Sequence, residues 1–248
     1  MNFGSRNPFA DLPIVVKNLL ILNGLMLLAT YACSSAGINL AQILGLHHWS
    51  SDLFRPHQLV TYMFMHGGIA HLFFNMFALY MFGKILEQVW GPKRFLTYYM
   101  ITGIGAGIIQ LLVTELRIQS LISDIDPAMY KQILDEGLSI RQMGKNYIDP
   151  IAAEINNLIN ISTVGASGAV FGILLAFGML FPNTQLMLII PPVPMKAKYF
   201  VLIYGAIELY QGIASNPNDN VAHFAHLGGM LFGFVMIKIW KTNTNNFY

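Results

Sequence analysis

The 248-residue sequence carries little charge. Asp, Glu, Lys and Arg make up 10% of its residues, whereas hydrophobic residues make up 55%. The mean hydropathy is +0.54, and several apolar runs approach the roughly 20 residues that a helix needs to cross a bilayer. The formal net charge of +2 is too small to indicate a nucleic-acid partner. We therefore predict an all-α, polytopic membrane protein surrounded by the lipid bilayer.

Cysteine is scarce and several catalytic motifs are missing. The single cysteine, Cys33, excludes an internal disulfide and a metal site built from several cysteines. The sequence has no HExxH motif of a metalloprotease, no pair of aspartates within its apolar runs and no P-loop. The histidines lack nearby carboxylate or cysteine ligands that would complete a zinc site. We predict no metal and no cofactor.

The apolar runs divide the chain into six predicted spans. No cleavable signal peptide is expected, because the first run contains Lys17 and is long enough to serve as an uncleaved anchor. A polar insertion, 116–161, separates the third and fourth spans. The expected organisation is a short segment 1–14, a membrane domain 15–240 and a tail 241–248. The predicted spans are residues 15–36, 60–90, 95–113, 167–181, 199–214 and 221–240.

Positive charge predicts the orientation of these spans. With a cytoplasmic amino terminus, nine of the 14 Lys and Arg fall in inner loops or at inner helix ends: Arg6, Lys17, Lys84, Lys93, Arg94, Lys196, Lys198, Lys238 and Lys241. The positive-inside rule therefore favours both termini in the cytoplasm. In this orientation the second, fourth and sixth spans all begin on the outer side of the membrane.

A serine stands at the head of the fourth span, in the stretch GASGAVFG that covers residues 165–172. The flanking Gly165 and Gly168 allow close approach of backbone, and the N–H groups of the first helical turn can stabilise negative charge beside the Ser167 hydroxyl. Small residues at four-residue spacing are equally typical of helix packing in membranes. This stretch alone leaves both interpretations open.

The second span contains His66, His71 and Asn75 in the sequence MHGGIAHLFFNMFALYMFG. His71 and Asn75 are four residues apart, so they share a helix face and can direct donors to one place. Polar side chains in a membrane helix are often functional, although each could also bond to a neighbouring helix. For His66, which lies beside two glycines, we expect a structural hydrogen bond to loop backbone.

The sixth span supplies a candidate base. In VAHFAHLGGMLFG, His226 is followed on its own helix face by Gly229 and Gly233. These glycines allow close packing against the fourth span, which would bring His226 to Ser167. An imidazole can accept a serine proton at neutral pH. His223 is the competing candidate, but Gly229 and Gly233 align less well with its face of the helix.

In combination and in this order, the motifs HGGIAHLFFN, GASG and AHLGG resemble those of rhomboid intramembrane serine proteases over roughly residues 50–240. The resemblance implies a six-helix bundle in which Ser167 is the nucleophile and His226 the general base of a dyad without a third carboxylate. It assigns the oxyanion hole to His71, Asn75 and the backbone N–H of Ser167. It also implies that Phe171 lies under the imidazole.

By the same resemblance, the substrates are transmembrane proteins cut near the outer face, and the location is a bacterial cytoplasmic membrane. A catalytically inactive rhomboid-like protein that binds transmembrane clients is the alternative. A transporter is less favoured, because Glu208 is the one carboxylate clearly inside a span and the polar side chains cluster at the outer ends. Where many rhomboids have a Trp and Arg pair before the second span, this sequence has His57 and Gln58.

The insertion 116–161 is longer than expected for a minimal bacterial rhomboid. Asp126 before Pro127 and Asp149 before Pro150 each predict a helix start, with an N-cap followed by proline. Both predicted helices have an apolar stripe. We expect an amphipathic, interfacial lid that leads directly into Ser167, or a solvated insertion without effect on turnover.

Overall fold

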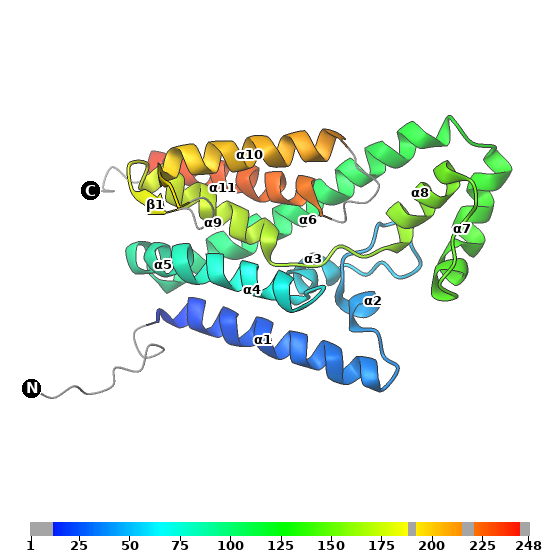
Figure 1. Cartoon of the computed structure of the whole chain (residues 1–248), viewed down its shortest axis with the longest axis horizontal. Helices are drawn as coiled ribbons and strands as arrows, with labels where there is room; N and C mark the ends of the chain where they lie inside the picture. Colours follow the sequence, from blue (N-terminus) through cyan, green and yellow to red (C-terminus); the bar gives the residue numbers. More distant parts are fainter. Residues whose placement is uncertain (1–11, 188–191, 215–220, 244–248) are drawn as a thin grey trace, which may run out of the picture.

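The structure, a computed structural model, describes residues 12–187, 192–214 and 221–243. The predicted segment 1–14 and tail 241–248 therefore lie mostly outside the described residues. Six long or apolar helical segments run alongside one another (Figure 1). They are α1 (Ile14–Ser35), α4 (Ile69–Ala78) continued through the π-helix η2 (Leu79–Gly83) and α5 (Lys84–Trp90), α6 (Pro92–Ile122), α9 (Ser167–Leu180), α10 (Ala197–Ala214) and α11 (His223–Asn243).

The outward faces of this bundle are apolar, as expected for helices in contact with lipid. Leu28, Phe74, Leu202 and Tyr210 are among the large hydrophobic side chains that stay exposed. Within the described residues, α1, the segment Ile69–Trp90, α6 and residues 223–240 are long and apolar enough to cross a membrane, and α9 is a shorter apolar helix. The polytopic helical bundle is confirmed, and the number of six spans stays a prediction.

The second predicted span begins later than expected. Residues 58–64 form two short helices, α3 (Gln58–Thr61) and the 3-10 helix η1 (Tyr62–Phe64), and α4 begins only at Ile69. The break occurs because Tyr62 turns into the bundle: it is buried, and its hydroxyl donates to the carbonyl of Gly103 at 2.6 Å. The predicted span 60–90 is therefore not one continuous helix at this end. A further short helix, α2 (Leu40–Leu44), precedes it.

The centre of the bundle is formed by α6, α9 and α11, which approach each other at small residues. A Cβ added at Gly229 in α11 would overlap the carbonyl oxygen of Gly168 in α9. One at Gly233 would overlap the Tyr98 hydroxyl of α6, which donates to the carbonyl of Gly172 at 2.8 Å. The close approach of the fourth and sixth spans is therefore confirmed.

Gly229→Ala should destabilise the protein, because the new methyl group meets the backbone of α9 and cannot be accommodated by a side-chain rotation. We expect a loss of about 1 to 3 kcal/mol, the usual cost of overpacking a close-packed interior. The measurement is the unfolding midpoint of the detergent-solubilised protein. Gly24→Ala in α1 is the matched control, since nothing lies within 4 Å of its added Cβ. Equal stability of the two variants would contradict close packing at Gly229.

The insertion folds as two helices on the extended end of α6. α7 (Pro127–Gln142) and α8 (Pro150–Asn160) begin where predicted, with the side chains of Asp126 and Asp149 accepting backbone N–H groups. α6 continues nine residues beyond the predicted end of the third span, because Ile118 is buried in a small core with the insertion. This core contains Ile118, Ile133, Ala152, Ile155 and Ile159.

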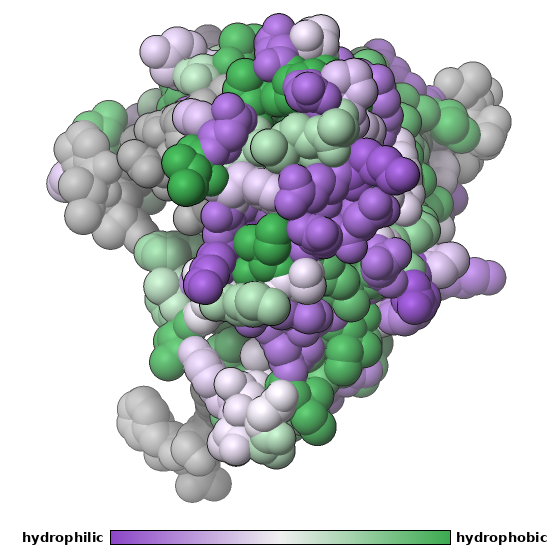
Figure 2. Space-filling view, turned by 90° about the vertical axis from the view of Figure 1, so that its right-hand side faces the viewer, coloured by the Kyte–Doolittle hydropathy of each residue, from purple (hydrophilic) through white to green (hydrophobic). Residues whose placement is uncertain are grey.

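α7 and α8 project beyond the end of the bundle and do not lie over the start of α9 (Figure 1). Seen from that end, hydrophilic residues gather across the middle of the surface (Figure 2). The chain returns from α8 to α9 along a segment bonded to the neighbouring loops. Leu46 and Thr163 exchange backbone hydrogen bonds of 2.9 and 2.8 Å, and the N–H of Gly165 donates to the carbonyl of Tyr62 at 2.9 Å. The role of the insertion as a lid stays a prediction.

The opposite end of the bundle holds the start of α1, the end of α11 and a hairpin of β1 (Gln185–Met187) and β2 (Pro194–Lys196), which pair antiparallel with Gln185 opposite Lys196 (Figure 1). Here the buried carboxylate of Glu87 accepts the backbone N–H groups of Val15 and Val16 at 2.9 and 2.8 Å. This carboxylate fixes the start of α1 against α5, where the first N–H groups of a helix lack partners of their own.

Candidate active site

Ser167 is the first residue of α9, at the end of the bundle where α4 and α11 also begin. The turn before it depends on Gly165, whose φ of +134° is a backbone conformation that other residues rarely adopt. A Cβ at Gly165 would also lie 2.9 Å from Cε1 and Nε2 of His71 and 3.5 Å from the Ser167 hydroxyl oxygen. The serine and His71 thus flank the same glycine.

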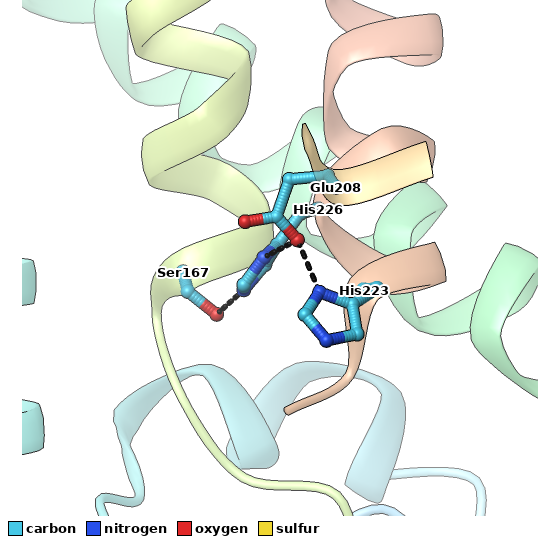
Figure 3. A network of polar contacts seen from close by, with 4 residues as sticks. All are labelled: Ser167, Glu208, His223 and His226. Atoms are coloured by element: carbon cyan, nitrogen blue, oxygen red, sulfur yellow. Dashed lines mark hydrogen bonds and ion pairs between the residues drawn. The ribbon is translucent and has the colours of Figure 1, made fainter. Parts of the chain in front are cut away.

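His226 lies in the first turn of α11 and reaches across to the serine. Its Nε2 is 2.8 Å from the hydroxyl oxygen of Ser167 (Figure 3). The ring of Phe171, one turn along α9, stacks on the imidazole with 4.1 Å between ring centroids and an angle of 7° between planes. Of the two candidate histidines, the structure brings His226 to the serine.

A carboxylate that the sequence reasoning did not place here completes this group of side chains. Glu208 of α10 directs Oε2 to Nδ1 of His226 at 2.8 Å and to Nδ1 of His223 at 2.6 Å (Figure 3). A carboxylate therefore contacts the histidine where none was expected, and the catalytic roles of the serine and the histidine stay a prediction. The available signal was Glu208 itself, since an ionisable residue within a span is a functional candidate by default.

His71 and Asn75 lie on α4, as predicted, on the other side of the serine. Nδ1 of His71 accepts the N–H of Gly67 at 3.4 Å, so a neutral ring carries its hydrogen on Nε2, beside Gly165. Asn75 is buried, and its amide donates one hydrogen to the carbonyl of His71 at 2.9 Å. The assignment of both side chains and of the Ser167 N–H to an oxyanion hole stays a prediction.

His66 was expected to form a hydrogen bond to loop backbone, but within the described residues its ring forms none. Its ring is buried, neither nitrogen has a partner, and the ring packs edge to face on His71 with 5.1 Å between centroids. Burial, followed by repulsion from His71, lowers the pKa of His66 to about 4. His66 is therefore neutral at pH 7 and supports His71 by packing.

Acid should destabilise the fold through His66. The unfolded chain, with a histidine pKa of about 6.5, binds more protons than the folded protein between about pH 4 and pH 6.5, so stability falls as the pH drops through this range. His66→Phe keeps the ring and removes the titrating group. The unfolding midpoint should then fall less between about pH 7.5 and about pH 4.5 than in the unsubstituted protein. His57→Phe, at an exposed position, is the control, and equal falls in all three proteins would refute this role.

The loop before α3 is organised by Gln58, one of the two residues expected to stand in place of the Trp and Arg pair. Its buried side chain accepts the N–H groups of His47 and Arg55 at 3.3 and 3.2 Å. It also donates to the carbonyls of Ile43 and Leu53 at 3.3 and 2.8 Å. One amide thus bonds to four backbone groups of this loop.

Glu208, His223 and His226 also meet the spacing of a metal site, with one ligand atom from each within 4.8 Å of the others. Two imidazoles and a carboxylate are suitable zinc ligands. The sequence-based ground for excluding zinc, the lack of a carboxylate near the histidines, is therefore wrong, while the absence of a resident metal stays a prediction. The present contacts of 2.6 and 2.8 Å are those of a hydrogen-bonded group.

Comparison with known proteins places this chain in a family. The family model described as Rhomboid domain matches residues 53–242. Rhomboid protease GluP of Bacillus subtilis is 27% identical over 124 residues, which cover 48% of this chain and 24% of that protein. RHOMBOID-like protein 6, mitochondrial, of Arabidopsis thaliana is 27% identical over 180 residues, 72% of this chain and 42% of that protein. Rhomboid protein 1, mitochondrial, of Saccharomyces cerevisiae is 25% identical over 170 residues, which cover 68% of this chain and 38% of that protein. The chain spans less than half the length of these three relatives.

Proposed function

Because this chain belongs to the rhomboid family, we propose that it is a serine endopeptidase that cleaves transmembrane proteins near the outer membrane face. The observation that carries the proposal is the 2.8 Å contact between Nε2 of His226 and the hydroxyl oxygen of Ser167. A serine hydroxyl becomes a nucleophile when a neighbouring base can take its proton. The backbone N–H of Ser167 at the helix start and the side chains of His71 and Asn75 would donate hydrogen bonds to the oxyanion that develops on the substrate carbonyl.

In the proposed reaction, a substrate helix enters from lipid and unwinds locally, since a helical peptide carbonyl is already engaged in a hydrogen bond. Ser167 Oγ bonds to the exposed carbonyl carbon while His226 Nε2 takes the hydroxyl proton. The peptide C–N bond breaks, and His226 gives this proton to the leaving amine. Water then attacks the ester in the same manner and restores the serine.

The multi-pass helical bundle indicates a membrane protein, and its charge distribution supports an orientation. Most of the described basic residues lie on elements that begin or end at the end of the bundle opposite Ser167. They are Lys17, Lys84, Lys93, Arg94, Lys196, Lys198 and Lys238. By the positive-inside rule this end faces the cytoplasm and the serine faces the outer side. A bacterial cytoplasmic membrane with both termini inside is the proposed location.

The proposal is tested by reaction of the purified protein in detergent with a fluorophosphonate probe. An adduct located on Ser167 by mass spectrometry, and cleavage of a reporter with a transmembrane segment, are the expected results. A folded protein that neither forms the adduct nor cuts the reporter would overturn the proposal. That outcome favours the alternative, a rhomboid-like protein that binds transmembrane clients without cutting them.

His71→Ala and Asn75→Ala should each lower kcat on the order of 10²-fold, if each side chain donates one hydrogen bond to the oxyanion. Because such a donor acts mainly on the transition state, KM should change little. Steady-state cleavage of the reporter measures both constants. Thr30→Ala is a suitable control, since the Thr30 hydroxyl bonds within α1 to the carbonyl of Met26. Unchanged kcat in the His71 and Asn75 variants would remove both residues from the oxyanion hole.

A further inference from the structure

We propose that Glu208 is a positioning residue for catalysis, which holds His226 in the tautomer and orientation that its action as a base requires. This inference rests on the proposed function of Ser167 and His226. Glu208 comes from a different helix, α10, and its side chain lies between the two histidines of α11 (Figure 3). The chain would thus use a Ser-His-Glu triad, in which the carboxylate orients the imidazole and does not take the proton.

The hydrogen bonds determine the tautomer of His226. A carboxylate oxygen carries at most one proton, so Oε2, which contacts Nδ1 of both His223 and His226, must accept from at least one ring. An ionised carboxylate accepts from both. Nδ1 of His226 then carries the hydrogen, and the lone pair of Nε2 points to Ser167 at 2.8 Å. This tautomer can take the serine proton, whereas the other tautomer cannot.

Burial increases the effect of the carboxylate charge. Glu208, His223 and His226 are each 7% exposed. When His226 takes the serine proton it becomes an imidazolium, and the nearby negative charge stabilises it more in such surroundings than in water. This stabilisation arises only as the proton moves, so it should act on kcat more than on KM.

His223 contributes by holding the carboxylate in place. It donates to the same oxygen as His226 and lies nearly one turn before it on α11. A carboxylate bonded from two sides has fewer orientations available, and the Cβ of His223 would contact a Cβ added at Gly212 of α10 at 3.3 Å. The two helices are therefore close at this point, which keeps the distance between Glu208 and His226 short.

A purely structural role for Glu208 predicts different results. A bonded carboxylate between α10 and α11 could simply tie the helices together, as Glu87 ties α1 to α5. Its loss would then lower stability and leave the turnover of folded molecules unchanged. Resident zinc on the three side chains would instead make activity sensitive to a chelator.

The experiment compares Glu208→Gln, Glu208→Asp and Glu87→Gln with the unsubstituted protein in detergent. We measure kcat and KM on the transmembrane reporter, the rate of fluorophosphonate labelling and the unfolding midpoint. Glu208→Gln should lower kcat and the labelling rate on the order of 10²-fold or more, with KM changed by less than about threefold. Glu208→Asp keeps the charge, so its kcat and labelling rate should be at least about tenfold higher than those of Glu208→Gln. Glu87→Gln should lower the unfolding midpoint without lowering kcat.

The outcomes separate this inference from the proposed function. If the unsubstituted protein labels at Ser167 and Glu208→Gln labels at the same rate, only the positioning role is overturned. A loss in Glu208→Gln that follows a drop in folded fraction, with normal kcat per folded molecule, would also overturn it. Activity lost on treatment with EDTA would replace positioning by metal binding. If the unsubstituted protein does not label, the proposed function fails and the inference fails with it.

Discussion

Replacement of Ser167 by alanine is expected to abolish cleavage of a transmembrane reporter while the protein stays folded. In the proposed reaction the hydroxyl oxygen is the atom of Ser167 that forms a covalent bond to substrate, and alanine at a helix start leaves the backbone geometry unchanged. Loss of such a nucleophile costs on the order of 10⁶-fold in kcat in serine proteases. The unfolding midpoint should change by little, because Ser167 is only partly buried.

Ser35→Ala serves as the control for this experiment. Ser35 ends α1 and bonds to the carbonyl of Ala32 at 2.7 Å, so the same oxygen is removed at a site without a base. This variant should cleave the reporter and label as the unsubstituted protein does. Cleavage that persists in purified Ser167→Ala would show that another group carries the nucleophile.

Replacing the two histidines separately should give unequal losses. His226→Asn removes the imidazole whose Nε2 lies 2.8 Å from the hydroxyl oxygen of Ser167, and we expect kcat to fall on the order of 10⁴-fold or more. His223→Asn leaves Glu208 bonded to His226 and should cost less than about tenfold. The two changes are chemically identical and three residues apart on one helix, so each is the matched control of the other.

The measurement is the single-turnover rate of fluorophosphonate labelling, supported by the kcat of reporter cleavage. A larger loss in His223→Asn than in His226→Asn would reverse the assignment of the base. Equal and large losses would show that the carboxylate needs both imidazoles. In either case the unfolding midpoints of the two variants must be compared with that of the unsubstituted protein, because both rings are buried.

The sequence predicts those parts of the site that depend on spacing within one helix. His226 and Gly229 share a face in any α-helix. Close packing of α11 against the start of α9 could therefore be predicted from the three-residue spacing of this histidine and glycine. The helix starts at Asp126 and Asp149 followed from their capping pattern in the same way. Each of these signals is contained in fewer than eight consecutive residues.

Glu208 could not be placed from spacing, because its position depends on the rotation of α10 about its own axis. The helix is apolar on most sides, so its sequence does not say which side faces α11. Similarly, residues 60–68 are apolar enough to continue the second span, and the break at Met65 to Gly68 arises from burial of Tyr62 against α6. Contacts between distant segments decided both features.

The backbone bonds at Thr163 and Gly165 hold the segment that leads from the insertion to Ser167. Along this segment, a displacement of α7 and α8 meets the backbone bonds to Leu46 and then to Tyr62 before it reaches the serine. The helix α6, which packs on both α8 and α9, is a second connection. The position of the nucleophile is therefore set by Leu46, Tyr62 and the bundle helices as well as by the segment that arrives from α8.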